Sequence, residues 1–204
     1  MFNGLKQKWN RNRLKDDTYA FLFDKYEGDE VVVYDTETTG LNPKKDEILS
    51  IGAVVVRGNT IVTSKTFELF LKPSQQISRK SIEIHHIRPC DVASALDPYE
   101  GIDAFLRFIG SRPLVGYYLE FDVAMINKYI KPWLGITLPN RKIEVSALYY
   151  NKKIELIPQG NIDLRFDTIL YDLNIPNMGL HNAVNDAIMT AMIYIKLLNT
   201  KRLT

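Results

Sequence analysis

A β-branched run leads directly into acidic residues in the segment Val31-Val32-Val33-Tyr34-Asp35-Thr36-Glu37-Thr38-Thr39-Gly40. The apolar run predicts a short interior strand that ends at Asp35. Asp35 and Glu37 are two residues apart, so strand periodicity directs both carboxylates to one face of the sheet. Two like charges at one strand end repel each other, and Mg²⁺ or Mn²⁺, which prefer carboxylate oxygens, would relieve that repulsion. Taken alone, the pair can equally be a solvated strand end or a turn cap.

The segments that follow alternate between strand-like and helix-like patterns. Apolar or alternating runs predict strands at residues 48–56, 60–71 and 114–118. Helical spacing predicts helices at 102–109, 164–173 and 187–198, and another at 122–130 that stops before Pro132. An antiparallel meander followed by alternating helices and strands predicts an α/β fold with a mixed central β-sheet flanked by helices.

Length and composition restrict the class of protein without identifying its activity. The chain has 204 residues, of which 46% are hydrophobic and 25% charged, which is ordinary globular usage for one domain with an appendage. A single cysteine, Cys90, excludes an internal disulfide and a cysteine-based zinc site. The net charge of +2 is too small to indicate a nucleic-acid or membrane partner. No apolar run suits a signal peptide or a membrane span, so a soluble, cytoplasmic protein is expected.

Residues 1–29 are predicted to form a helical, basic appendage to a main domain at 30–204. All the charge of the first fifteen residues is positive, and it comes from Lys6, Lys8, Arg11, Arg13 and Lys15. Two interpretations remain open. The segment packs on the main domain with a solvated basic face, or it is a basic arm for a phosphate backbone.

Two more acids stand near the starts of predicted helices. Asp122 follows Phe121, and Asp186 lies among apolar neighbours five residues after His181. Helix capping explains Asp122 alone, and a solvent-facing position explains Asp186 alone. An acid among apolar residues needs a partner, however, and four acids together fit a hard metal ion better than four separate explanations.

Five short segments place these residues in a particular order along the chain. They are residues 33–40, residues 46–54, Ile84-His85-His86-Ile87, Phe121-Asp122 and His181-Asn182-Ala183-Val184-Asn185-Asp186. This set resembles the motifs of the DEDDh 3′→5′ exonucleases, the family that includes ribonuclease T and the epsilon proofreading subunit of bacterial DNA polymerase III. The resemblance covers residues 31–199 and implies a ribonuclease H-like exonuclease fold. The chain departs from the family where His86 replaces a glycine and where Tyr117 and Tyr118 replace a His-Asn pair, so substrate contacts there are expected to differ.

The resemblance implies a role for each motif residue. Asp35, Glu37, Asp122 and Asp186 would be catalytic ligands of two divalent ions, Mg²⁺ or Mn²⁺. His181 would accept a proton from the attacking water, a task that suits an imidazole near neutral pH. The residues expected to bind the substrate are Thr38, Thr39, Gly40, Leu41, His85 and Phe121, although His85 can equally be an ordinary turn residue. A short basic rim could be formed by Lys44, Lys45, Arg79, Lys80 and Arg88.

The expected function is metal-dependent hydrolysis of single-stranded DNA from its 3′ end, which releases nucleoside 5′-monophosphates in proofreading or repair. A 3′→5′ exoribonuclease is the alternative, because a pocket for the 2′-OH cannot be recognised in the sequence. A non-catalytic nucleic-acid-binding adaptor would lack an acid or the histidine, and none is missing. Because the sequence ends at Thr204, soon after the last predicted helix, stable docking on a polymerase through a C-terminal extension is not expected.

Overall fold

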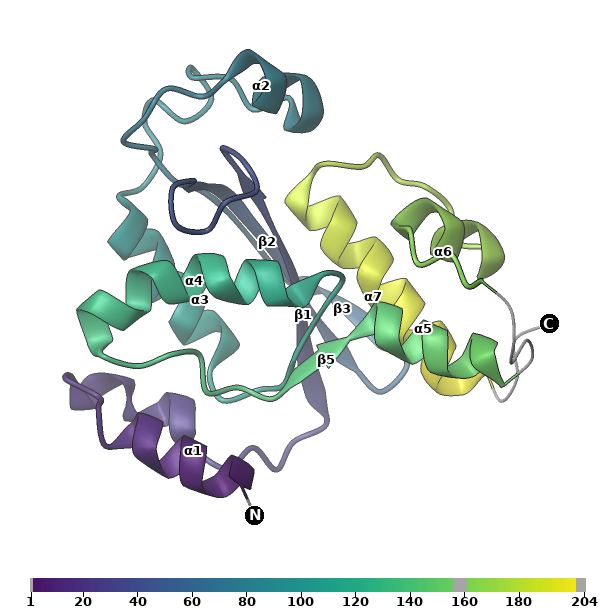
Figure 1. Cartoon of the computed structure of the whole chain (residues 1–204), viewed down its shortest axis with the longest axis horizontal. Helices are drawn as coiled ribbons and strands as arrows, with labels where there is room; N and C mark the ends of the chain where they lie inside the picture. Colours follow the sequence, from purple (N-terminus) through teal and green to yellow (C-terminus); the bar gives the residue numbers. More distant parts are fainter. Residues whose placement is uncertain (1, 156–160, 201–204) are drawn as a thin grey trace.

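A five-stranded mixed sheet occupies the centre of the protein (Figure 1), and the computed structural model describes residues 2–155 and 161–200. The strands are β1 (Glu30–Thr38), β2 (Ile48–Arg57), β3 (Thr60–Phe70), β4 (Leu114–Gly116) and β5 (Lys142–Glu144). They lie in the order β3-β2-β1-β4-β5. The first three form the predicted antiparallel meander, whereas β4 runs parallel to β1 and β5 runs parallel to β4.

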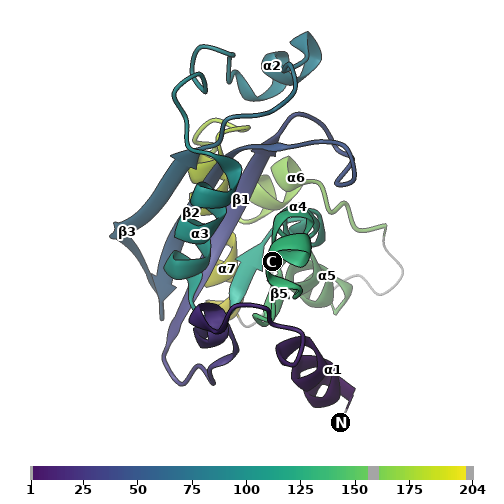
Figure 2. The ribbon, with the colours of Figure 1, turned by 90° about the vertical axis from the view of Figure 1, so that its left-hand side faces the viewer.

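Helices cover both faces of the sheet (Figures 1 and 2). One face carries α3 (Pro98–Ile109) and α4 (Leu119–Leu134). The other carries α5 (Val145–Ile154), α6 (Phe166–Asp172) and α7 (Ala183–Asn199). The short helix α2 (Arg79–His85) lies at one end of the molecule, and α1 (Phe2–Arg11) lies at the opposite end. No helix within the described residues has the length and apolar character needed to cross a membrane.

Alternation along β1 determines which residues meet which helices. Val32 and Tyr34 are buried in the core shared with α3 and α4, whereas Val33 is buried in the core shared with α7. Because side chains alternate between the two faces, Asp35 and Glu37 follow Val33 toward α7, and Thr36 points toward α4. The end of β1 therefore offers polar groups to both helical layers.

The prediction that the helix at residues 122–130 stops before Pro132 is wrong, because that helix, α4, continues to Leu134 and is capped by Gly135. A proline inside a helix removes a hydrogen bond and costs about 3 kcal/mol. Burial of Ile130 and Leu134 on either side of it favours the continued helix. The N-terminal appendage also provides hydrogen-bond donors for two carbonyl groups at the end of α4. The Lys15 side chain donates to the Pro132 carbonyl, and the Lys15 backbone N–H donates to the Leu134 carbonyl.

The N-terminal segment packs on the rest of the protein. After α1, a 3₁₀ helix, η1 (Asp17–Phe23), buries Tyr19 and Leu22 in the core of α3 and α4. Asn10 is held at both ends of its amide: Nδ2 donates to the Thr137 carbonyl at 2.7 Å, and Oδ1 accepts the Thr137 N–H at 3.0 Å. The packed interpretation of this segment therefore agrees with its contacts. Residues 1 and 201–204, the outer ends of the two predicted regions, lie outside the described residues.

Candidate active site

Three carboxylates meet where β1 ends against the start of α7. Asp35 and Glu37 come from β1, and Asp186 comes from the first turn of α7. One oxygen from each lies within 4.8 Å of the others. Alternation in β1 directs the two strand acids toward α7, and Asn182 fixes the start of that helix by accepting the Asn185 N–H at 3.0 Å. The carboxylates that the sequence predicted as metal ligands are thus close enough to share an ion.

Gly52 allows α7 to approach the strand acids. It lies opposite Asp35 in β2, and a Cβ there would be 2.2 Å from the Ala183 carbonyl carbon and 2.3 Å from the Val184 nitrogen. We expect Gly52→Ala to displace the start of α7, to lower the free energy of unfolding by about 1–3 kcal/mol and to weaken Mn²⁺ binding. Thermal melting and calorimetric titration measure the two effects. Gly4→Ala, which adds a Cβ with no neighbour within 4 Å, is the control; equal behaviour of the two variants would contradict this account.

Asp122 approaches from the other helical layer. It lies in the first turn of α4, is 3% exposed, and accepts two hydrogen bonds at Oδ1 from the side chain and backbone N–H of Thr36, at 2.5 and 3.1 Å. Thr36 can make this contact because it points to the face opposite Asp35 and Glu37. Its hydroxyl was not singled out in the sequence, yet it holds the fourth acid in place.

Burial raises the pKa of each carboxyl in this cluster. Desolvation is the largest cause, and it raises the pKa of Glu37 to about 8, that of Asp122 to about 7 and that of Asp186 to about 6. The pKa of Asp35 also lies well above its ordinary value, because the charges of Asp122, Glu37 and Asp186 add to its burial. A cation among these groups would favour their ionised forms.

Among the fully buried oxygens of the cluster, one has no hydrogen-bond partner within the described part of the chain. Asp186 Oδ1 is buried and unpaired, whereas Oδ2 accepts the His181 N–H at 3.0 Å. A buried carboxylate oxygen without a partner is costly, and an ion shared with Asp35 and Glu37 would satisfy it. All the atoms that could bind the ion are carboxylate oxygens, the ligands that hard divalent cations prefer. The residues therefore fit a divalent metal site.

We expect the metal-free protein to lose stability as the pH rises from 6.5 to 8.5. Glu37 and Asp122, with pKa values of about 8 and about 7, retain protons in the folded protein that the unfolded chain has already released. The free energy of unfolding therefore falls with pH until both groups are ionised. Mn²⁺ should raise the melting temperature most at pH 8.5, because it binds the ionised carboxylates. Melting in EDTA and in Mn²⁺ tests this; a pH-independent midpoint in EDTA would contradict it, and Glu37→Gln should flatten the dependence.

His181 stands beside the cluster with its side chain exposed. Its backbone adopts the left-handed conformation, with φ of 62°, and its N–H donates to Asp186. The contact to the acid therefore comes from the backbone, and the imidazole is left in the same cavity as the four acids. That cavity has a volume of about 510 Å³.

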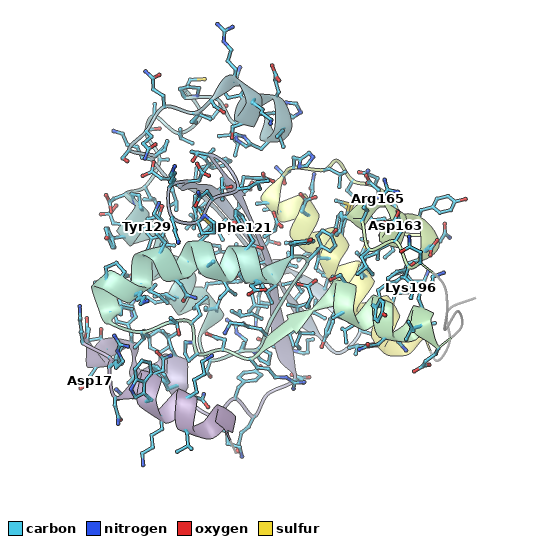
Figure 3. The ribbon with its side chains drawn as sticks, in the orientation of Figure 1. Asp17, Phe121, Tyr129, Asp163, Arg165 and Lys196 are labelled. Atoms are coloured by element: carbon cyan, nitrogen blue, oxygen red, sulfur yellow. The ribbon has the colours of Figure 1, made fainter. Side chains whose placement is uncertain are left out.

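The cavity includes most of the substrate-binding residues predicted from the sequence. Thr38, Gly40, Leu41 and Phe121 line it, with Leu41 86% exposed and Phe121 on α4 (Figure 3). Thr39 does not line it. Its hydroxyl instead accepts the Glu47 N–H at 3.0 Å, which ties β1 to the loop before β2. The predicted contact of Thr39 with substrate is therefore not supported by its position.

His85 lines the cavity but is engaged within the protein. The ring accepts the Ile87 N–H at Nδ1, 3.0 Å away, so the proton lies on Nε2, which donates to the Ser81 hydroxyl at 3.0 Å. Ser81 in turn donates to the Thr38 carbonyl. Burial lowers the pKa of His85, in keeping with a neutral ring. This arrangement favours a role for His85 in holding the end of β1 over direct contact with a phosphate.

The two tyrosines that depart from the family pattern have different environments. Tyr117 packs on Phe166 with ring centroids 4.8 Å apart, and its hydroxyl donates to the Leu164 carbonyl at 3.0 Å. Tyr118 is 70% exposed and begins α4 in the left-handed conformation. Tyr117 thus forms part of the wall, and Tyr118 presents a ring at the mouth of the cavity.

Several lining residues were missed in the sequence, and none of the predicted basic rim lines the cavity. The missed residues are Thr36, Ser81, Ile84, Phe166, Asp167, Leu180 and Thr190. His86 is exposed and caps the end of α2. Of the predicted rim, Arg88 is paired with Asp91 at 3.0 Å, and the others, Lys44, Lys45, Arg79 and Lys80, lie outside the cavity lining.

Comparison with known proteins places this arrangement in a family. Residues 32–194 match the RNase T family model, described as an exonuclease family. The chain is 32% identical over 165 residues to a PolC-type DNA polymerase III of Thermotoga maritima, covering 81% of this chain and 12% of that protein. It is 30% identical over 167 residues to the DNA polymerase III subunit epsilon of Aquifex aeolicus, covering 82% of this chain and 79% of that protein.

A solved structure supports the same fold. E. coli exonuclease I in complex with a dT13 oligonucleotide superposes with a TM-score of 0.66 at 17% identity, over 84% of this chain and 41% of that one. The mixed sheet flanked by helices is therefore the ribonuclease H-like exonuclease fold that the motifs implied. With the family model matching from β1 into α7, this chain belongs to the RNase T exonuclease family.

Proposed function

We propose that this protein is a metal-dependent 3′→5′ exonuclease that removes nucleotides from single-stranded DNA and releases nucleoside 5′-monophosphates. The observation that carries the proposal is the convergence of Asp35, Glu37, Asp122, Asp186 and His181 on one open cavity at the end of β1. Residues 30–204 are proposed as the exonuclease domain and residues 1–29 as its appendage. The names of the similar proteins favour a place in DNA proofreading or repair.

The four acids are proposed to hold two divalent ions, Mg²⁺ or Mn²⁺. When bound, such ions would offset the negative charge that develops on the phosphate and lower the pKa of the attacking water. Asp35 is the acid whose pKa is raised by the charges of all three other acids. It is therefore our choice for the ligand shared between the ions.

His181 is proposed to take the proton from the attacking water. Its imidazole is exposed in the cavity, while its backbone N–H fixes the loop to Asp186. A base carried on a loop that is hydrogen-bonded to a metal ligand keeps a constant position relative to the reacting phosphate. The backbone bond thus does the positioning and leaves the ring free for proton transfer.

The 3′-terminal nucleotide is proposed to lie between the end of β1 and the start of α4. Leu41 and Tyr118 present apolar surface at the mouth, and Phe121 lies within the cavity. Bases of single strands are commonly held by such stacking contacts. Thr38 donates its hydroxyl to the Gly40 carbonyl at 2.7 Å, which shapes the turn that faces the terminal sugar.

The proposal is tested with 5′-labelled single-stranded DNA and RNA of the same sequence, incubated with Mg²⁺, Mn²⁺ or EDTA. We expect a ladder that shortens from the 3′ end, disappears in EDTA and forms faster on DNA. Faster shortening of RNA would make the exoribonuclease the correct activity. Intact oligonucleotides under every condition would exclude both activities.

A further inference from the structure

A second groove lies beside α1, outside the cavity that holds the acids. Two hollows of about 690 and 590 Å³ share six residues, so they form one continuous groove. The shared residues are Lys6, Trp9, Asn10, Thr137, Leu138 and Lys142. We call this feature the α1 groove; its lining residues come from α1, from α4 and from the chain segment that links α4 to β5. Figure 1 shows where these elements lie.

The α1 groove is basic, and its charges are not neutralised by the protein. Its cationic side chains are Lys6, Arg13, Lys131, Arg141 and Lys142. Within the part of the chain that the structure describes, none of the five forms an ion pair. The groove also contains two acids, Glu120 and Glu144. Five cations against two acids leave an excess of positive charge, and Glu144 is held in place by the backbone N–H groups of Tyr118 and Leu119.

An aromatic ring is exposed among these cations. Trp9 is 60% exposed, and the Arg13 guanidinium lies 4.5 Å from the centre of its ring. Asn10, the next residue in α1, pairs with the Thr137 backbone and so ties this helix to the segment after α4. Cations that meet phosphates, together with an aromatic face that stacks on a base, are the features that bind single-stranded nucleic acid.

The α1 groove and the catalytic cavity share no lining residue, but they lie on either side of the first turn of α4. Tyr118, Phe121 and Asp122 line the cavity, whereas Leu119 and Glu120, between them in sequence, line the groove. A strand whose 3′ end lies at the acids can therefore cross this turn and continue past α1. The family match begins at residue 32, so α1 adds a surface that lies outside the matched region.

We propose that the α1 groove binds the phosphate backbone of the substrate strand on the 5′ side of the cleaved nucleotide, with Trp9 stacking on a base. The direction of the strand rests on the proposed 3′→5′ activity. The binding itself rests on the positive charge of the groove, the exposed ring of Trp9 and the continuity of the two hollows that make up the groove.

The test is binding of labelled dT12 and dT3 to the full chain in EDTA, measured by fluorescence anisotropy between 50 and 200 mM KCl. The groove variant is Lys6→Ala/Arg13→Ala/Lys131→Ala. The control variant, Lys8→Ala/Lys25→Ala/Lys196→Ala, removes the same charge outside the groove, and Lys196 lies far from α1 in Figure 3. Melting temperatures verify that both variants are folded.

We expect the groove variant to bind dT12 at least about tenfold more weakly at 50 mM KCl. The slope of log K against log salt should become shallower by about 2, since each lost phosphate contact on a single strand contributes roughly 0.7. Trp9→Ala should weaken dT12 binding about tenfold, and Trp9→Phe should retain most of the affinity. Binding and Mg²⁺-dependent hydrolysis of dT3, which is too short to reach α1, should not change in any of these variants.

The results separate this inference from the proposed function. Groove-dependent binding of dT12 without hydrolysis by the wild type would overturn the exonuclease and leave the binding surface in place. Hydrolysis by the wild type, with the same affinity and salt slope in the groove and control variants, would overturn the inference alone.

Discussion

Asp35→Asn is expected to lower kcat/KM on single-stranded 3′ ends by about a thousandfold or more. Asp35 lies in the group of three carboxylates whose oxygens come within 4.8 Å of one another, and the charges of all three other acids raise its pKa, so neutralising it removes a ligand proposed to hold the ions. The loss of about 4 kcal/mol of transition-state stabilisation from metal catalysis corresponds to this factor. The same change removes a carboxyl that resists ionisation, so the metal-free variant should melt at a higher temperature than the wild type at pH 8.5.

A lower kcat/KM together with a higher melting temperature in the absence of metal would distinguish a lost metal ligand from a damaged fold. Glu83→Gln, which neutralises an exposed acid on α2 outside the cavity lining, is the matched control and should change neither quantity. Steady-state kinetics in saturating Mg²⁺ and melting in EDTA give both values. Wild-type activity in Asp35→Asn would contradict the assignment, and a fall in both activity and stability would indicate misfolding.

His181→Asn is expected to lower kcat by about 10²- to 10⁴-fold, the usual contribution of a general base. Asparagine tolerates the left-handed backbone that His181 adopts, and it preserves the N–H that donates to Asp186. The substitution therefore removes the imidazole with little change in the loop. Calorimetric titration with Mn²⁺ should give the same affinity as the wild type, because no metal ligand is lost.

The matched control for this histidine is His86→Asn. His86 is exposed, has φ of 59° and does not line the cavity, so its replacement should leave kcat unchanged. Unchanged turnover in His181→Asn would refute the proton-transfer role. Weakened Mn²⁺ binding would instead show that the histidine acts by maintaining the metal site.

The sequence predicts the central sheet well because its pattern is local. The β-branched run before Asp35 and the alternating segment before Leu71 indicate strands without reference to the rest of the fold. The passage of α4 through Pro132 is favoured by the burial of Ile130 and Leu134 and by the hydrogen bond from Lys15, more than a hundred residues away in the chain. These tertiary contacts offset the cost of a proline inside the helix, and they cannot be read from the local pattern of a single sequence. The short β5 and the helix α5 likewise depend on their neighbours, since β5 has only three residues and pairs with β4 alone.

In the candidate site, too, the sequence predicts what local pattern determines and misses what tertiary contacts determine. Each predicted acid lies at the end of a recognisable strand or the start of a recognisable helix, so the motifs locate the carboxylates. The roles of Thr36 and Ser81 depend on which face each presents and on what lies opposite, as with the hydrogen bond from Thr36 to Asp122. Thr39 was predicted from the motif to bind substrate, but its hydroxyl instead accepts a hydrogen bond from the loop before β2.

Hydrolysis of dT12 in water enriched in oxygen-18, followed by mass spectrometry of the products, tests the central claim most directly. If the acids and His181 direct water onto the phosphorus at the 3′ end, the released products are nucleoside 5′-monophosphates. Each should carry one heavy oxygen, and none should form in EDTA. Nucleoside 3′-monophosphates, heavy oxygen in the shortened oligonucleotide, or release that continues in EDTA would contradict the mechanism.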